Sequence, residues 1–397
     1  MTTAGTRADG RAAMHPSSEI SRRQVLLQLG ADEHQADVLL AYNRNHFHHE
    51  SISPPVALPL ADEKSVCEWR GYMRESAATG VAATLKRHFP QLNFPIRSGM
   101  SNDPEYRKAT RSGVPWTGMA AARGLELRKP DGLELLIHPT LAGHIPLLIA
   151  HERSDFEHLL CAFLYRNEPH EIPTSMGAAM ITGFNNWSRI AKLREMFNLA
   201  HPAASEKDWP DEFARIKPQH HLYQDRFILV SNSPYSGVTQ ERPELSLIMR
   251  CEHESVHYMT KRLLGSMKNN LLDELIADYT GIVAACSLFR GDWFLRFMGL
   301  EDYPRYREGG RFQNYLSDPP VPQDCVDLLR ALLVRATENL AAFDVANRAR
   351  LRLPRSRALM PLALCRLTLE ILASDRACEL LRQELDQVFR DFIIADD

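Results

Sequence analysis

The chain has 397 residues, of which 44% are hydrophobic and 24% charged, with 47 Lys and Arg against 50 Asp and Glu and a formal net charge of −3. This composition is that of a globular protein long enough for two or three domains, and it excludes a wholly disordered chain. The near balance of charge, without a long run of like charges, offers no surface for a phosphate backbone, so nucleic acid is not an expected partner.

The start of the chain and its cysteines indicate the compartment. The first 18 residues are polar and rich in Ala and Gly, without the apolar stretch of a signal peptide. No later stretch is apolar over the length that crosses a membrane, so we expect a cytoplasmic protein. The seven cysteines never fall in C-x-x-C spacing, which predicts reduced, mostly buried thiols. Any metal would then be held by His and carboxylate side chains.

The first part of the chain is predicted to be a disordered start, residues 1–18, followed by a mainly helical cap, residues 19–118. Apolar spacing over 21–45 predicts two short helices interrupted near Gly30. A second helical pattern covers 72–88, and the Pro, Gly, Ser and Asn content of the residues after it predicts loops.

Residues 119–240 are predicted to form a small α/β region with a sheet. Four short apolar runs have the composition of buried strands: 133–137, 145–150, 178–183 and 227–232. Ser154 and Glu157 form a capping-box pattern, which predicts a helix that begins there and runs through Leu164. A further helix is predicted over 185–197.

Residues 241–397 are helical in pattern almost throughout. Five helices are predicted: 243–264, 271–289, 325–346, 358–373 and 377–393. Helices, a small sheet with helices and then a helical C-terminal region make the expected fold class α+β.

One segment of this helical region carries a motif with metal-binding spacing. His253-Glu254-Ser255-Val256-His257 is an H-E-x-x-H sequence. Two histidines four residues apart lie one above the other on a helix, so both imidazoles can reach one ion. Glu254 lies beside them without being a ligand. The pattern predicts a zinc ion, Zn2+, held by His253 and His257, with Glu254 as an adjacent general base.

A second motif supplies a third ligand. Glu274, 17 residues beyond His257, begins an E-x-x-x-D sequence that ends at Asp278. The helix beyond His257 is about 10 Å long, and residues 265–270 can span up to roughly 20 Å, which is enough to reverse the chain. We therefore expect Glu274 to return beside His257 as a ligand. Asp278, one turn further on, is expected to accept the second ring N–H of a ligand histidine.

This arrangement predicts a hydrolytic reaction. A zinc ion with two His and one Glu ligand keeps a fourth position for water. Glu254 would take a proton from that water and deliver it to the leaving group of an amide or similar acyl bond. The expected substrate is a peptide or a small amide.

The two motifs together resemble the gluzincin group of zinc metallopeptidases, and the sequence ELIADYTG is similar to their E-x-x-A-D-x-x-G variant. The resemblance covers about thirty residues and implies a zincin-like core with a small sheet and active-site helices. It implies that His253, His257 and Glu274 are the metal ligands. It also implies that Glu254 is the catalytic glutamate and Asp278 the orienting aspartate. The segment also resembles one in uncharacterised bacterial proteins, which implies no activity.

The chain departs from the gluzincin pattern downstream of the motifs. Many gluzincins stabilise the transition state with a later His or Tyr, and this chain has no His after His257. Residues 303–315 contain Tyr306 and Arg311 in a Gly-containing loop, and we expect them to act as an oxyanion or substrate-carboxylate clamp. In gluzincins an edge strand before the active-site helix binds extended substrate, and the run 227–232 is the expected equivalent.

Alternatives stay open for both site and function. The metzincin pattern needs a third His where this chain has Leu263, whereas an aspzincin-type site with Asp278 as ligand stays possible. The favoured function is a zinc-dependent hydrolase of the metallopeptidase or amidase type, with no cofactor but zinc and no membrane or nucleic-acid partner. A small-molecule biosynthetic metalloenzyme and a non-catalytic metal-binding protein are the alternatives, and no oligomeric state is predicted.

Overall fold

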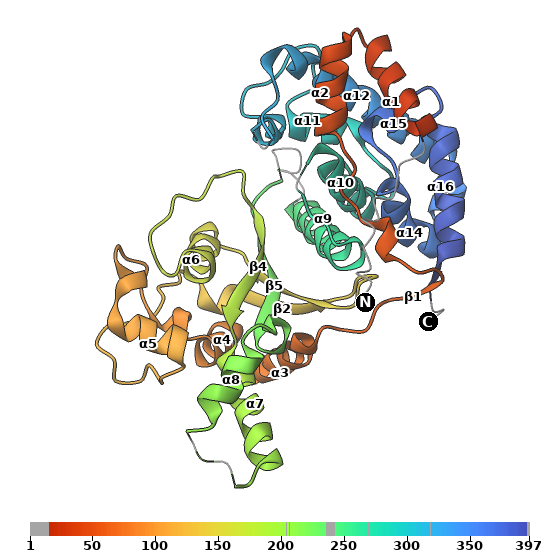
Figure 1. The fold of residues 1–397 in the computed structure, drawn as a ribbon. Helices are drawn as coiled ribbons and strands as arrows, with labels where there is room; N and C mark the ends of the chain where they lie inside the picture. Colours follow the sequence, from red (N-terminus) through yellow and green to blue (C-terminus); the bar gives the residue numbers. More distant parts are fainter. Residues whose placement is uncertain are drawn as a thin grey trace, which may run out of the picture. The chain divides into compact units, whose positions relative to one another are not determined.

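The computed structural model describes residues 16–203, 205, 207–235, 243–268, 270–317 and 319–394, which fall into two compact units (Figure 1). The helical unit comprises the described residues of Met1–Ala57 and Thr260–Asp396, and the sheet unit those of Leu58–Met259. The predicted domain boundaries stay a prediction, and residues 1–15 of the expected disordered start lie outside the described part. Among the described residues, we find no helix with the length and hydropathy of a membrane-spanning segment.

The described residues confirm the α+β fold class, with sixteen α-helices and a small mixed sheet. Short 3-10 helices connect several elements: η1 (His49–Ser51), η2 (Pro90–Asn93), η3 (Met100–Asn102), η4 (Pro130–Gly132), η5 (His220–Leu222) and η6 (Arg311–Tyr315). All seven cysteines are free thiols, four of them buried, as their spacing predicted.

The sheet unit is built around four strands in the order β2-β3-β5-β4. Their bounds are Leu133–His138 for β2, Ile145–Ala150 for β3, Ala178–Asn185 for β4 and Gln224–Ser231 for β5. Strands β3 and β5 are parallel, and the other two pairs are antiparallel. The run 227–232 therefore lies in an inner strand, and the expectation that it is an edge strand is wrong: the edges are β2 and β4.

The inner position of β5 follows from its composition. Phe227 to Val230 are all fully buried, and β3 is likewise buried along its whole length, as expected for strands covered on both faces. On one face the rings of Trp69, Phe163 and Phe227 pack together, with centroids 4.9–5.0 Å from Phe227. The continuous apolar runs thus predicted burial correctly, but they did not reveal the order of the strands.

Seven helices belong to this unit or begin in it: α3 (Lys64–Thr79), α4 (Val81–His88), α5 (Pro104–Ser112), α6 (Arg153–Leu164), α7 (Trp187–Ala200), α8 (Trp209–Ile216) and α9 (Pro243–Leu264). The helical pattern over 72–88 is broken at Gly80, whose φ of 79° ends α3. Helix α5 lies in the segment predicted to be loops, where Asp103 caps it by accepting the backbone N–H groups of Glu105 and Tyr106.

The predicted capping box at the start of α6 is wrong. The N-cap residue is Glu152, without a side-chain cap, and Glu157 forms an ion pair with Arg153, with 2.7 Å between Nε and Oε1. Asp155 instead accepts the backbone N–H groups of Arg128 and Lys129, at 2.6 and 2.9 Å. Because α6 begins at Arg153, Ser154 lies in its first turn and not at the N-cap position.

A buried aspartate joins three elements of the sheet unit. Asp225 on β5 accepts hydrogen bonds from Trp69 Nε1 of α3 at 2.9 Å and from Asn186 Nδ2 at 2.6 Å. Arg189 Nη1 of α7 pairs with its other oxygen at 2.6 Å, and both side chains are almost wholly buried. Asn186 also caps α7 by accepting the Arg189 backbone N–H. The network fixes the start of α7 and the middle of α3 on the sheet.

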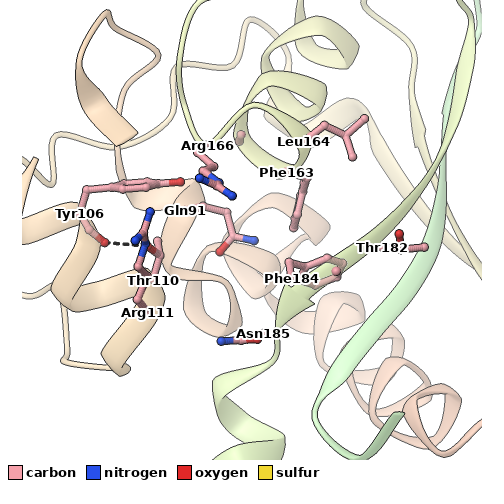
Figure 2. Close-up of a pocket in the computed structure, with 12 residues that line it drawn as sticks. Gln91, Tyr106, Thr110, Arg111, Phe163, Leu164, Arg166, Thr182, Phe184 and Asn185 are labelled. Atoms are coloured by element: carbon pink, nitrogen blue, oxygen red, sulfur yellow. Dashed lines mark hydrogen bonds between the residues drawn. The ribbon is translucent and has the colours of Figure 1, made fainter. Parts of the chain in front are cut away.

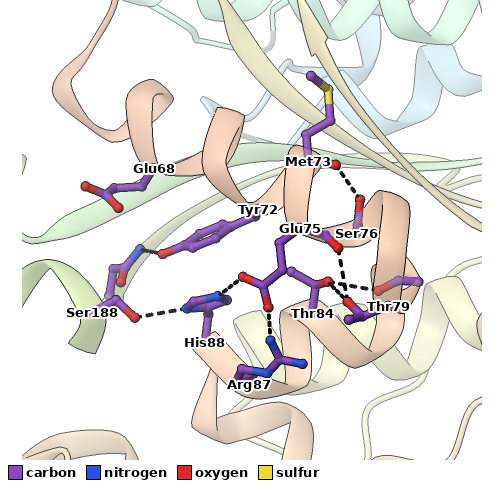
Figure 3. Close-up of polar contacts among 12 residues, drawn as sticks. Glu68, Tyr72, Met73, Glu75, Ser76, Thr79, Thr84, Arg87, His88 and Ser188 are labelled. Carbon is purple, nitrogen blue, oxygen red and sulfur yellow. Dashed lines mark hydrogen bonds and ion pairs between the residues drawn. The ribbon is translucent and has the colours of Figure 1, made fainter.

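A second set of polar contacts joins α3, α4 and α7 (Figure 3). Glu75 accepts from His88 Nε2 at 2.9 Å and also pairs with Arg87, and His88 Nδ1 lies 3.1 Å from Ser188 Oγ. The His88 ring stacks on Tyr72, with centroids 4.1 Å apart. These contacts hold α4 against the start of α7, beside the buried aspartate network.

The helical unit contains α1 (Pro16–Gln28), α2 (Glu33–Tyr42), α10 (Leu271–Cys286), α11 (Gly291–Met298), α12 (Gln323–Ala346), α13 (Arg348–Leu351), α14 (Pro354–Leu364), α15 (Leu369–Leu372) and α16 (Ala377–Asp391), with β1 (Val56–Leu58) pairing with β6 (Phe392–Ile394). Helix α12 is its centre and packs against α2, α11, α15 and α16. The helix predicted over 358–373 is two helices, because Thr368 accepts the Ile371 N–H and begins α15 anew.

Candidate metal centre

Helix α9 presents both motif histidines on one buried face. His253 and His257 are only 6% and 4% exposed, and their Nε2 atoms lie 3.2 Å apart. Two nitrogen ligands of a tetrahedral zinc ion, each about 2.0–2.1 Å from the metal, lie about 3.3 Å apart. The spacing of the two imidazoles therefore fits one zinc ion.

The other ring nitrogen of His253 has a partner that the sequence did not indicate. The hydroxyl of Tyr235 lies 3.3 Å from His253 Nδ1, and both residues are buried. A hydrogen bond at Nδ1 orients the ring so that Nε2 faces His257, as partners of metal-binding histidines do. Tyr235 stands outside both motifs, so no spacing rule could have found it.

Helix α10 supplies the carboxylate. Asn270 caps it by accepting the Asp273 backbone N–H at 3.0 Å, and Asp273 accepts the Lys268 N–H at 3.0 Å. Asp273 thus secures the helix start, which leaves Glu274, 6% exposed, as the acidic residue of the first turn that joins the histidines. One ligand atom from each of His253, His257 and Glu274 lies within 4.8 Å of the others. The three predicted ligands therefore form a buried candidate metal site.

Arg311 lies next to the carboxylates of α10. It pairs with Asp278, and its Nη1 is 3.9 Å from an oxygen of Glu274. Its guanidinium also stacks over Phe297 at 5.5 Å. Two carboxylates with one arginine leave a net negative charge, which suits a cation. Of the predicted loop residues, Arg311 thus lies beside a predicted ligand, and its expected role as a clamp stays a prediction.

Tyr315, at the end of η6, also bonds to Glu274. Burial and the neighbouring Glu274 carboxylate raise the pKa of the Tyr315 phenol well above its ordinary value, so it donates as a neutral hydroxyl. Its backbone carbonyl accepts the Tyr42 hydroxyl at 2.7 Å, which ties η6 to α2. The sequence placed Tyr315 in the candidate loop, but nothing distinguished it there from the other tyrosines.

Tyr306 has contacts of another kind. Its hydroxyl donates to the Gly310 carbonyl at 2.7 Å, and Arg330 stacks on its ring at 4.6 Å. These contacts close the loop against α12, and among the described residues its hydrogen bonds go to Gly310 and Gln313. The catalytic role of Tyr306 stays a prediction.

A buried arginine precedes His253 by one turn of α9. Arg250 donates to the carbonyls of Ser231 and Ser233, at 2.5 and 2.8 Å, and lies over the Tyr235 ring at 5.1 Å. Burial lowers its pKa, which the nearby Tyr235 and Glu254 partly oppose. Its guanidinium fills the space beside Gly177, where a Cβ would come within 2.4 Å. Arg250 thus anchors α9 to the end of β5.

Fold and site together define an α+β protein with a buried His/His/Glu candidate metal site. The chain belongs to the family of unknown function DUF7005, whose model matches residues 24–376. Comparison with curated proteins and with solved structures gave no match. The resemblance to gluzincins therefore rests on the two motifs and on the triad they form.

Proposed function

We propose that the protein is a zinc-dependent hydrolase that cleaves a peptide or small amide. The observation that supports this most is the buried triad of His253, His257 and Glu274, with ligand atoms within 4.8 Å of one another. Two imidazoles and one carboxylate are the ligand set of catalytic zinc sites that keep one position open. A zinc ion bound there would polarise a carbonyl and acidify a water molecule.

The side chains around the triad have separate tasks in this proposal. Glu254 follows a ligand histidine directly and is partly exposed, so its carboxylate is accessible for proton transfer. Arg311 and Tyr315 hold Glu274 through an ion pair and a hydrogen bond, and Asp278 completes the pair with Arg311. Tyr235 fixes the His253 ring. The chain thus provides a base and a pre-oriented ligand set.

The test is metal-dependent turnover by the full chain. Protein stripped with a chelator and protein reloaded with zinc are incubated with a peptide mixture and with a panel of small amides, and products are identified by mass spectrometry. We expect cleavage that disappears on stripping and returns with zinc.

The outcomes separate the alternatives. Zinc-dependent turnover of small amides alone would favour a small-molecule enzyme over a peptidase. Stoichiometric zinc without hydrolysis of either class would contradict the hydrolase proposal and favour a metal-binding protein.

A further inference from the structure

A cavity of about 370 Å³ lies in the sheet unit, beside the edge strand β4 (Figure 2). Four segments line it: η2, α5, the end of α6 with the turn after it, and β4. Its inner wall is apolar, because Phe163 and Phe184 are largely buried there with ring centroids 5.1 Å apart. None of the lining residues is an Asp or Glu. None of the lining residues belongs to the candidate metal site.

Two arginines stand at this cavity without an acidic partner. Arg111 of α5 and Arg166 after α6 both line it and both are exposed. Among the described residues, neither guanidinium has a carboxylate within ion-pair distance. The buried Arg189 of the same unit is, by contrast, paired with Asp225. Two arginines without an ion-pair partner, at a cavity that no Asp or Glu lines, favour an anion there.

Buried polar groups point into the same space. Tyr106 is 4% exposed, and Figure 2 shows its hydroxyl directed toward the Arg166 guanidinium. Burial and, more weakly, the Glu168 carboxylate raise the pKa of Tyr106, while the Arg166 and Arg111 guanidiniums act in the opposite direction. Gln91, which is 6% exposed, also lines the cavity. Among the described residues, neither its side-chain amide nor the Tyr106 hydroxyl has a hydrogen-bond partner. Buried polar groups normally form hydrogen bonds, and these two face the cavity.

The backbone around the cavity is held in unusual conformations. Arg166 and Asn167 have φ values of 55° and 60°, a region that non-glycine residues rarely adopt. The fully buried Asn167 amide secures this turn by donating to the Gln91 and Phe94 carbonyls, both at 2.9 Å. On the opposite wall, β4 has a register shift between Ile181 and Phe184. Bulges of this kind re-aim side chains next to sites.

We propose that this cavity binds a small organic anion, with its phosphate or carboxylate group between Arg111 and Arg166 and its apolar body against Phe163 and Phe184. Guanidiniums and a phenol hydroxyl are donors, and Arg presents a planar fork that matches an oxyanion. The two rings exclude water from the apolar part of the ligand. This inference is independent of the proposed hydrolase.

The experiment is calorimetric titration of the full chain with phenyl phosphate, benzoate, inorganic phosphate and neutral benzyl alcohol, in the presence of a chelator so that no metal holds the anion. We expect the aryl anions to bind more tightly than inorganic phosphate and benzyl alcohol not to bind. The stronger of phenyl phosphate and benzoate identifies the head group. Arg111→Gln and Arg166→Gln should each weaken binding about tenfold or more, and Tyr106→Phe less.

Arg107→Gln is the matched control, because Arg107 is exposed on the same helix α5 and does not line the cavity. It should leave the affinity unchanged. Both cavity arginines are exposed and unpaired, so their variants should fold, and unchanged thermal unfolding checks this. Absence of binding by every anion, or equal affinity for wild type, Arg111→Gln and Arg166→Gln, would overturn the proposal.

Discussion

Glu254→Gln is expected to lower the rate of zinc-dependent hydrolysis by about 10²–10⁴-fold, because the amide cannot accept a proton from water. The variant should still bind one metal ion per chain, since Glu254 is not among the three residues whose ligand atoms converge. Gln is nearly isosteric with Glu, so the fold should be unchanged. The measurement is turnover and metal content on the same preparations.

Glu252→Gln is the control for this substitution. Glu252 lies on the same helix, is partly exposed, and its Oε1 is 3.3 Å from His138 Nε2. Its loss removes a carboxylate from α9 without touching the motif, so turnover should stay near that of wild type. A Glu254→Gln protein that is as active as the Glu252→Gln protein would remove Glu254 from the mechanism.

The second large effect concerns stability. Asp225→Ala should lower the free energy of unfolding by about 3–5 kcal/mol, because it leaves the buried Arg189 guanidinium without its counter-charge. The change also removes the acceptor for Trp69 Nε1 and for the Asn186 amide. Since these donors belong to α3 and to the start of α7, both helices should lose their attachment to β5. Denaturant unfolding followed by circular dichroism measures the loss.

Glu68→Ala provides the comparison for an ion pair at the surface. Glu68 pairs with Lys192, whose side chain is 60% exposed, and such pairs contribute less than about 1 kcal/mol. Asp225→Asn should lie between the two, because the amide oxygen can still accept a hydrogen bond. If Asp225→Ala and Glu68→Ala destabilise the protein equally, the buried network does not secure the sheet unit.

Much of the fold was predictable where the pattern is local. The bounds of β3 and α9 were predicted residue for residue. In β3 an apolar run ends at polar residues on both sides, and in α9 the helical spacing of apolar residues extends over the whole helix, so the local sequence indicates where each element begins and ends. The errors concern the exact start of a helix and the order of the strands, which the local pattern does not determine. Helix α6 begins one residue before Ser154, which therefore does not cap it, and the strand order places residues 227–231 in an inner strand.

Some residues of the candidate site could be predicted from the sequence and others could not. His253, His257 and Glu274 were predictable because helical spacing and a short connection determine which side chains can meet. Tyr235 and Tyr315 contact these residues from segments without a motif, so only the folded chain shows them. The cavity beside β4 was invisible for the same reason, since its lining residues come from four separate segments.

The most direct test of the metal site is elemental analysis of untagged protein purified without added metal, comparing wild type with His257→Ala. His34→Ala serves as control, because His34 is exposed on α2. We predict about one zinc ion per chain in wild type and in His34→Ala, and almost none in His257→Ala. Equally low metal in all three proteins, also after reconstitution with zinc, would contradict the metal site and with it the proposed hydrolase.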